Sequence, residues 1–220
     1  MKDEGGLLMP VPFITVEGPI GVGKTSLSKA IAETQQFRLL EEIVDENPFL
    51  NKFYDNIEEW SFQTEMFFLC NRYKQLSDIK TEITIEQKSV VADYNIFKNL
   101  IFAKRTLDSI EYKKYEEIYT ILTKDMPVPN IIVYLHASID TLMERISIRG
   151  RDFEKNMDRA YLEQLSDDYD TFITHFESSH PSIPVLRFNG DDLDFVNNNE
   201  DLQFILDTVD STIRKGVIFK

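Results

Sequence analysis

Residues Gly18-Pro19-Ile20-Gly21-Val22-Gly23-Lys24-Thr25 match the phosphate-loop pattern G-x-x-x-x-G-K-[ST] at every fixed position. The apolar run 13–17 before this stretch predicts a short buried strand, and Leu27, Ala30 and Ile31 after it have helical spacing. Strand, glycine-rich loop and helix in this order surround a phosphate with backbone N–H groups and a helix N-terminus. The stretch therefore predicts binding of a nucleoside triphosphate, rather than a glycine-rich turn without function.

Each residue type in the loop has a chemical role. Glycines let the backbone approach a phosphate where a Cβ would obstruct it. We expect Lys24 to reach the β- and γ-phosphates of ATP and the Thr25 hydroxyl to ligate Mg²⁺. The residues expected to bind the triphosphate are Gly18, Pro19, Ile20, Gly21, Val22, Gly23, Lys24, Thr25 and Ser26.

Composition limits the class of protein. The 220 residues fit one domain with an ample core, and the formal net charge of −14 disfavours nucleic acid as a partner. A single cysteine, Cys70, precludes an internal disulfide and is typical of a reducing compartment, so we expect the cytoplasm. No apolar run has the length of a membrane span. We read residues 1–12 as a loose lead-in, because they lack the apolar core of a signal peptide.

Five apolar runs alternate with helical stretches along the chain, at 13–17, 38–44, 90–93, 131–136 and 185–188. This alternation predicts an α/β fold with a doubly wound, five-stranded parallel sheet and helices on both faces. Ligands of such sheets bind beyond the carboxyl ends of the strands, so the residues after each strand are the candidates for a site.

Acidic residues follow two of these strands. Strand alternation would turn Glu41 and Glu42 to opposite faces, one toward the site as a proton acceptor and one toward solvent, although both could be solvated. Asp93 ends the third strand, where it could serve magnesium or the substrate, or cap a helix that starts near Asn95.

The stretch 58–80 predicts a long helix that is apolar nearly all round. We expect one side to meet the core and another to meet a second subunit in a homodimer. Glu65 and Arg72 are seven residues apart and share a face of this helix. Charges in so apolar a segment require a partner or a ligand.

A cluster of arginines follows the fourth strand. The stretch 138–148 predicts a helix, and Arg145 and Arg149, four residues apart, share one helical face at its end. Gly150 breaks the helix, and Arg151 follows. The cluster suits a lid, at about 145–156, that clamps phosphates, although the helix dipole alone would also favour it. Phe195 after the last strand could stack on adenine or anchor a loop.

Together these features resemble the deoxynucleoside kinases over nearly the whole chain. The specific parts are Glu42, the stretch Trp60-Ser61-Phe62 that opens the long helix, and the lid stretch from Arg145 to Arg151. The resemblance implies a phosphate-loop NTPase fold and these roles: a base near the 5′-hydroxyl for Glu42, contacts to the sugar 3′-hydroxyl for Tyr54 and Glu154, contacts to the phosphates for Arg149 and Arg151, and a place over the adenine for Phe195. The stretch 42–54 looks most like the Bacillus-type branch of the family.

Two positions depart from the usual family pattern. The acid-Arg-Ser stretch after the third strand is replaced by Asp93-Tyr94-Asn95, so an arginine beside the 5′-hydroxyl is missing and a lid arginine is one candidate to replace it. Glu65 falls where the family usually has a base-reading glutamine. The Bacillus-type deoxyguanosine kinases are similar to this chain at both points.

Glu65 is the basis for an expected preference for deoxyguanosine. A carboxylate accepts both N1–H and the 2-amino group of guanine, and Arg72 can donate to O6 or N7. Adenine and cytosine instead present a lone pair to the carboxylate. The alternative is that Glu65 and Arg72 pair only with each other and that the base is read elsewhere.

The sequence therefore predicts an ATP- and Mg²⁺-dependent 5′-kinase of a purine deoxynucleoside, with a deoxyadenosine or deoxycytidine kinase as the alternative. A nucleoside monophosphate kinase is less favoured, because the expected acceptor pocket is acidic: it holds Glu42, Glu65, Asp93 and Glu154. A GTPase-like switch is disfavoured, because Asn51-Lys52-Phe53-Tyr54 lacks the aspartate of Asn-Lys-x-Asp. The stretch Asp93-Tyr94-Asn95-Ile96 after the third strand likewise lacks the glycine of Asp-x-x-Gly.

Overall fold

The computed structural model describes residues 11–44, 46–155 and 157–215. Five strands, β1 (Phe13–Glu17), β2 (Arg38–Leu40), β3 (Val90–Ala92), β4 (Ile131–His136) and β5 (Val185–Asn189), form one parallel sheet in the order β2-β3-β1-β4-β5. The three central strands are buried almost throughout, as expected when helices cover both faces. The predicted fold class is confirmed. Most of the expected lead-in, residues 1–10, lies outside the described residues.

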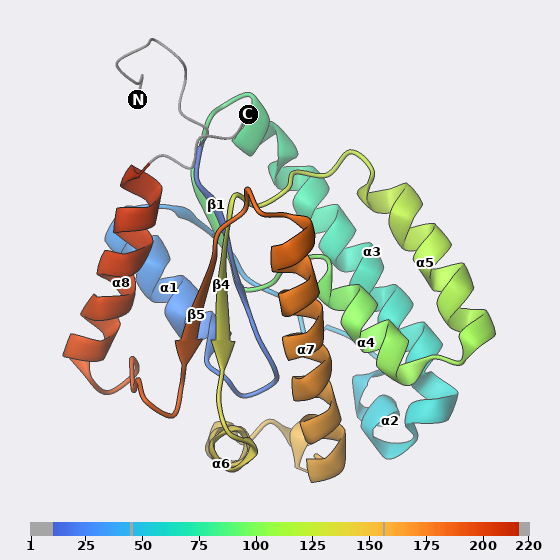
Figure 1. The fold of residues 1–220 in the computed structure, drawn as a ribbon. Helices are drawn as coiled ribbons and strands as arrows, with labels where there is room; N and C mark the ends of the chain where they lie inside the picture. Colours follow the sequence, from blue (N-terminus) through green and yellow to red (C-terminus); the bar gives the residue numbers. More distant parts are fainter. Residues whose placement is uncertain (1–10, 45, 156, 216–220) are drawn as a thin grey trace.

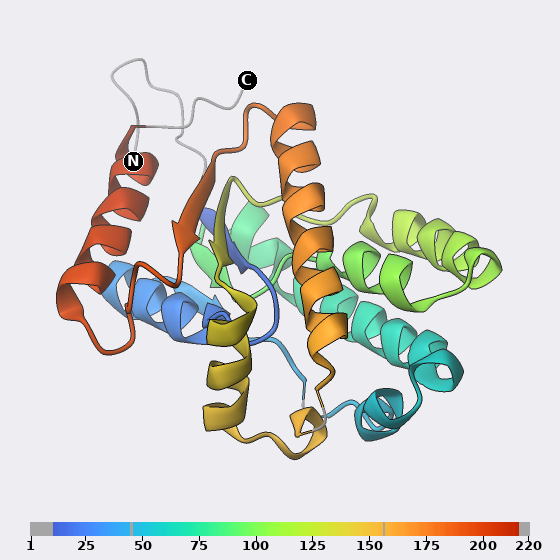
Figure 2. The same ribbon diagram turned by 60° about the horizontal axis from the view of Figure 1, so that its bottom comes forward.

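Helices lie on both sides of the sheet (Figures 1 and 2). On one side are α1 (Lys24–Gln35) and α8 (Asn199–Arg214), and on the other are α3 (Ile57–Thr84), α4 (Lys98–Thr106), α5 (Ser109–Thr123) and α7 (Arg159–Ser179). Near the carboxyl ends of the strands are the short helix α2 (Leu50–Asp55), α6 (Ile139–Arg149) and the 3₁₀ turn η1 (Asp152–Glu154). The open end of the sheet is therefore bordered by short, separate segments.

Side-chain caps fix where several helices begin. Asp108 accepts hydrogen bonds from Ile110 and Glu111 at the start of α5, and Ser138 accepts one from Thr141 at the start of α6. Gly150 ends α6 in the left-handed region at φ 65°, as its position in the sequence predicts. The lid stretch therefore turns sharply just after Arg149.

The second and third strands are shorter than predicted. β2 ends at Leu40 and not at residue 44, because the chain then leaves β3 and lines a cavity. Glu41 and Glu42 do diverge as expected, but from a loop and not from strand alternation: the Glu41 side chain is 49% exposed beside Lys29, whereas that of Glu42 is 10% exposed. Asp93 follows β3 and does not cap a helix, because α4 begins only at Lys98.

Helix α3 is buried on more than one side within its own chain. It packs against α2, α4 and α5, and its residues Leu69, Leu76 and Ile79 join Tyr115 of α5 in an apolar cluster. The apolar character that suggested a subunit contact is thus partly explained by α5. No helix within 11–44, 46–155 and 157–215 combines the length and the apolar character needed to cross a membrane.

Candidate active site

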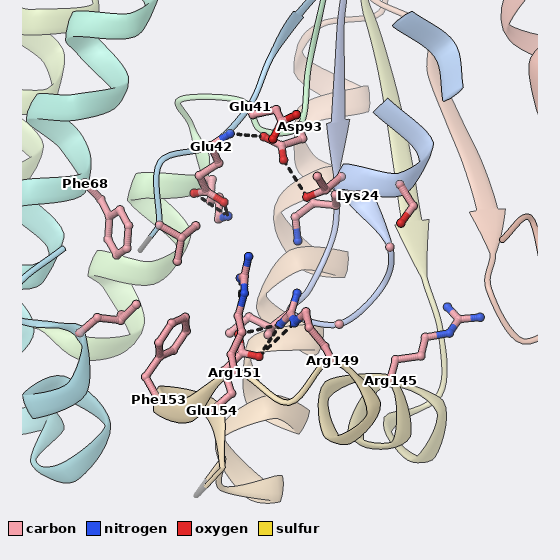
Figure 3. Close-up of a pocket in the computed structure, with 18 of the residues that line it drawn as sticks. Lys24, Glu41, Glu42, Phe68, Asp93, Arg145, Arg149, Arg151, Phe153 and Glu154 are labelled. Atoms are coloured by element: carbon pink, nitrogen blue, oxygen red, sulfur yellow. Dashed lines mark hydrogen bonds and ion pairs between the residues drawn. The ribbon is translucent and has the colours of Figure 1, made fainter. Parts of the chain in front are cut away.

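A cavity of about 710 Å³ opens at the carboxyl ends of the strands. It is bounded by the phosphate loop, the segment after β2, α3, the start of α4 and the segment from α6 to η1 (Figure 3). Among the predicted site residues, those that line it are Ile20, Gly21, Gly23, Lys24, Thr25, Ser26, Glu42, Tyr54, Glu65, Arg72, Asp93, Arg145, Arg149, Arg151 and Glu154. Within the described chain, the structure thus brings together residues that are spread over more than 130 positions of sequence.

The phosphate loop has the backbone that its glycines predict. A Cβ at Gly18, where φ is 145°, would lie 2.1 Å from the carbonyl oxygen of Leu135, so only glycine fits there. The Lys24 ammonium donates to the carbonyl oxygens of Gly18 and Pro19 at 2.8 and 2.9 Å. The pKa of Lys24 is lowered to about 7, mainly by burial and secondly by the positive charge of Lys98. A bound anion would reverse that shift, because it favours the charged amine.

Asp93 connects the phosphate loop to the segment after β2. Its carboxylate accepts from the Thr25 hydroxyl at 2.8 Å and from the backbone N–H of Glu42 at 2.6 Å. Burial, followed by the charge of Glu42, raises the pKa of Asp93 above its ordinary value. Asp93 therefore links the phosphate loop to the segment after β2 on the two sides of the cavity, and it contacts the hydroxyl expected to ligate the metal.

Glu42 is the most strongly paired acid of the site. The Lys98 ammonium donates to both of its oxygens, at 2.9 and 2.8 Å, and the Arg72 guanidinium donates through Nε at 3.1 Å and through Nη2. Burial alone would raise the pKa of Glu42, but Lys98 and then Arg72 hold it well below its ordinary value. Glu42 is therefore an ionised acceptor fixed from two sides.

Lys98 is the site residue that the sequence reasoning missed. It lies on the first turn of α4, is 6% exposed, and contacts Glu42 where a family arginine was expected to act. Tyr94 does not replace that arginine, because it is buried and donates to Gln75 at 2.9 Å. Arg149 of the lid does not replace it either, because Arg149 pairs with Glu154. A signal was available, since Lys98 is the one charged residue in the apolar stretch 96–103.

Glu65 and Arg72 lie in the α3 wall of the cavity, 2% and 4% exposed. No hydrogen bond or ion pair joins these two described residues, and two of the Arg72 nitrogens instead bind Glu42. Oε2 of Glu65 and Nη1 of Arg72 have no hydrogen-bond partner among the described residues. Burial raises the pKa of Glu65 from its ordinary value of 4.5 to about 8, with Arg72 opposing the shift. This wall therefore contains one buried acceptor and one buried donor that are both unsatisfied.

The lid stretch faces this wall across the cavity (Figure 3). Arg149 donates to both oxygens of Glu154, at 2.6 and 2.7 Å, and Arg151 lies 3.9 Å from the same carboxylate. Phe153 stacks on Tyr54 of α2, with ring centroids 6.2 Å apart. Burial, followed by the charge of Glu154, raises the pKa of Tyr54. Tyr54 and Glu154 therefore adjoin, as their expected joint contact to a sugar hydroxyl requires. Asn156, the last residue of the expected lid, lies outside the described residues.

The Phe195 side chain is packed in this structure, as the loop-anchor alternative predicts. It is 5% exposed and packs under the phosphate loop, so that a Cβ at Gly23 would lie 2.8 Å from its ring. Its neighbours Asp194, Val196 and Asn197 line the cavity instead. Arg145 lies nearby and donates to the carbonyl oxygen of Gly190 at 2.8 Å and to that of Val22 at 3.4 Å. Phe195 is thus a loop anchor and not an exposed stacking surface.

The donor set around Thr25 suits Mg²⁺. In the described part of the chain, no three His, Cys, Asp or Glu side chains cluster as metal ligands. Mg²⁺ at a phosphate site needs few, because it binds one or two protein oxygens together with substrate phosphates and water. The Thr25 hydroxyl, held by Asp93 at the end of the phosphate loop, is an oxygen donor of this kind.

A phosphate loop at the edge of a parallel sheet, with a cavity for an acceptor beside it, defines a phosphotransferase of the phosphate-loop NTPase fold. The family model described as deoxynucleoside kinase matches residues 14–214. The chain belongs to the deoxynucleoside kinase family and is an ATP-dependent phosphotransferase.

Particular relatives agree with this assignment. The deoxyguanosine kinase of Bacillus subtilis (strain 168) is 50% identical over 194 residues, which are 88% of this chain and 94% of that protein. The deoxyadenosine/deoxycytidine kinase of the same strain is 32% identical and covers 91% of this chain and 93% of that protein. The structure of deoxyadenosine kinase from M. mycoides with bound dCTP has a TM-score of 0.76 at 22% identity, over 90% of this chain and 99% of that one.

Proposed function

We propose that this kinase transfers the γ-phosphoryl group of ATP to the 5′-hydroxyl of purine deoxynucleosides and prefers deoxyguanosine. The observation that carries the preference is that the α3 wall of the cavity holds both a Glu65 carboxylate oxygen and an Arg72 nitrogen without a hydrogen-bond partner among the described residues. Guanine offers two adjacent donors, N1–H and the 2-amino group, to the Glu65 carboxylate, and the acceptors O6 and N7 to the Arg72 guanidinium. Both unsatisfied groups would then be satisfied by one base.

The phosphate loop would hold the triphosphate. Its backbone N–H groups and Lys24 would neutralise the β- and γ-phosphates, and Thr25 would ligate Mg²⁺. Bound Mg²⁺ would supply further neutralisation of phosphate charge. Arg145, at the carbonyl oxygens of Val22 and Gly190, would add a cation at the nucleotide side of the cavity.

Glu42 would orient the 5′-hydroxyl and accept its proton. A low pKa makes Glu42 a weak base but a reliable acceptor of a hydrogen bond, which suits a transfer in which positioning and charge neutralisation dominate. Arg149 and Arg151 would move toward the transferred phosphoryl group, and Tyr54 with Glu154 would hold the 3′-hydroxyl. The lid would be the stretch 145–156 of a single kinase domain.

We further propose a homodimer through α3 and a cytoplasmic location. Cys70 is exposed on α3, and Met66 and Phe67 beside it are only partly covered, so this helix retains an accessible apolar side. The single cysteine suits a reducing compartment. Sedimentation at micromolar concentration would test the dimer, and a monomeric mass would refute it.

A panel of acceptors tests the proposed function. Purified enzyme with ATP and Mg²⁺ is given each deoxynucleoside, each deoxynucleoside monophosphate, or no acceptor. We expect the highest kcat/KM with deoxyguanosine at slightly alkaline pH and no transfer to monophosphates. Phosphorylation of a monophosphate would overturn the proposal. The monophosphate arm is informative because Glu42 and Glu154 are paired with cations, so the acceptor side is less acidic than its sequence suggests.

A further inference from the structure

We propose that the proton on Glu65 gives this site two activities. The ionised carboxylate selects guanine, and the neutral carboxylic acid selects bases that present a bare ring nitrogen beside an amino group, as adenine and cytosine do. The inference rests on the proposed function, because it requires that Glu65 read the base.

The geometry leaves Glu65 without a cation of its own. Arg72, on the same face of α3, gives Nε and Nη2 to Glu42, and Lys98 gives its ammonium to both oxygens of Glu42. The Tyr115 hydroxyl contacts the backbone carbonyl of Glu65 at 3.4 Å and not its carboxyl group. The side chain is buried and its residue lines the cavity, so a ligand bound in the cavity would lie against it.

Titratable and charged groups approach Glu65 from every neighbouring segment: Arg72 on α3, Glu42 after β2, Tyr54 on α2, Lys98 on α4, Tyr115 on α5 and Tyr161 on α7. The pKa of each of the three tyrosines is raised by burial, so they stay neutral near pH 7. Glu42 stays ionised and repels a second negative charge. The three tyrosines and Glu42 thus keep their charge states near neutral pH, whereas the pKa of Glu65 is about 8.

The two forms of Glu65 have different hydrogen-bonding patterns. The ionised form has two acceptors, which match the N1–H and 2-amino donors of guanine. The neutral form has one donor and one acceptor, as an amide has, and these match N1 and the 6-amino group of adenine or N3 and the 4-amino group of cytosine. Guanine that binds the ionised form displaces the Glu65 proton to solvent, whereas adenine that binds the neutral form retains it.

The ratio of kcat/KM for deoxyguanosine to that for deoxyadenosine tests the inference. Below about pH 8, the pKa of Glu65, kcat/KM for deoxyguanosine should rise with pH while kcat/KM for deoxyadenosine stays constant. Above about pH 8, kcat/KM for deoxyguanosine should become constant and kcat/KM for deoxyadenosine should fall. The ratio should therefore rise about tenfold per pH unit between about pH 6.5 and 8.5. Because both substrates share ATP, Lys24 and Glu42, titration of those groups cancels in the ratio.

Glu65→Gln is the matched control, because it fixes the pattern of one donor and one acceptor without a titratable proton. Its ratio should not change with pH and should favour deoxyadenosine throughout. A wild-type ratio that is equally flat would overturn the inference. If deoxyguanosine leads at every pH, the proposed function survives such a result; if no deoxynucleoside is phosphorylated, the proposed function itself fails.

Calorimetry supplies a readout that does not depend on turnover. Binding of deoxyguanosine at about pH 7, measured in buffers of different ionisation enthalpy, should release close to one proton per site. Deoxyadenosine should release none, and Glu65→Gln should release none with either nucleoside. Equal proton release by wild type and variant would assign the proton to another group and overturn the inference.

Discussion

Lys98 shows how much one buried side chain can contribute to this site. Its ammonium spans both oxygens of Glu42 at 2.8 and 2.9 Å, while Arg72 holds the same carboxylate from α3. A lysine that is 6% exposed needs such a counter-charge. The Glu42 carboxylate, in turn, remains ionised because Lys98 lies beside it. Lys98 therefore sets both the position and the charge of the group expected to meet the 5′-hydroxyl.

Replacing Lys98 should lower kcat more than it changes KM for the nucleoside. Lys98→Met removes the charge and keeps most of the apolar stem, and we expect kcat to fall on the order of 10²-fold, with a smaller change in KM for the nucleoside. Lys98→Arg should recover part of the loss, since it restores a donor cation. Steady-state kinetics checks both variants. Lys104→Met, on the exposed side of the same helix, is the matched control and should be close to wild type. Unchanged kcat in Lys98→Met would remove Lys98 from the mechanism.

At the scale of elements, the loop after β5 packs against the phosphate loop. Phe195 packs under Gly23, and Arg145 of α6 ties the carbonyl oxygens of Val22 and Gly190 together. Three segments that are distant in sequence thus meet at the turn that would hold the triphosphate. The shape of the phosphate loop depends on this support as well as on its own glycines.

Phe195→Leu should loosen this support. We expect a loss of roughly 1–3 kcal/mol in the free energy of unfolding of the nucleotide-free protein, and a higher KM for ATP with little change in KM for the nucleoside. Chemical denaturation without nucleotide and steady-state kinetics measure the two effects. Phe204→Leu, at a side chain that is 57% exposed on α8, is the control. A variant with unchanged stability and a raised KM for ATP would favour direct stacking of Phe195 on adenine instead.

At the scale of the whole molecule, the buried acid Glu65 couples folding to pH. Its pKa in the folded protein is about 8, above the ordinary value of 4.5, so the folded state holds the proton more tightly than the unfolded state. The stability that comes from this proton is complete below about pH 4.5 and is lost as the pH rises through about 8. The ionised carboxylate that would bind guanine therefore lowers the free energy of unfolding at alkaline pH.

Glu65→Gln should be more stable than wild type at alkaline pH, because the amide never ionises. The difference in the free energy of unfolding should grow from near zero at about pH 4.5 to a few kcal/mol at about pH 8.5. Urea denaturation of both proteins across this range provides the measurement. Parallel stability profiles would show that Glu65 ionises at its ordinary pKa in the folded protein, and would also weaken the inferred second activity.

The sequence alone determined the features that depend on neighbouring residues. The stretch 18–25 predicted the phosphate loop, because a strand, three glycines and a helix start impose their geometry locally. The apolar runs predicted a parallel sheet, and Gly150 predicted the end of α6. Helix α7 went unpredicted although its buried positions 161, 162, 165, 169 and 173 have helical spacing.

Only the tertiary structure decided which charges meet. Glu42, Arg72 and Lys98 come from a loop and two helices, and their pairing depends on how α3 and α4 pack against each other beside the segment after β2. The same packing commits Arg72 to Glu42 and leaves Glu65 alone in the cavity wall. It also turns Phe195 into the core. Charge and burial act through space, so residues far apart in sequence fix one another's protonation only once the chain has folded.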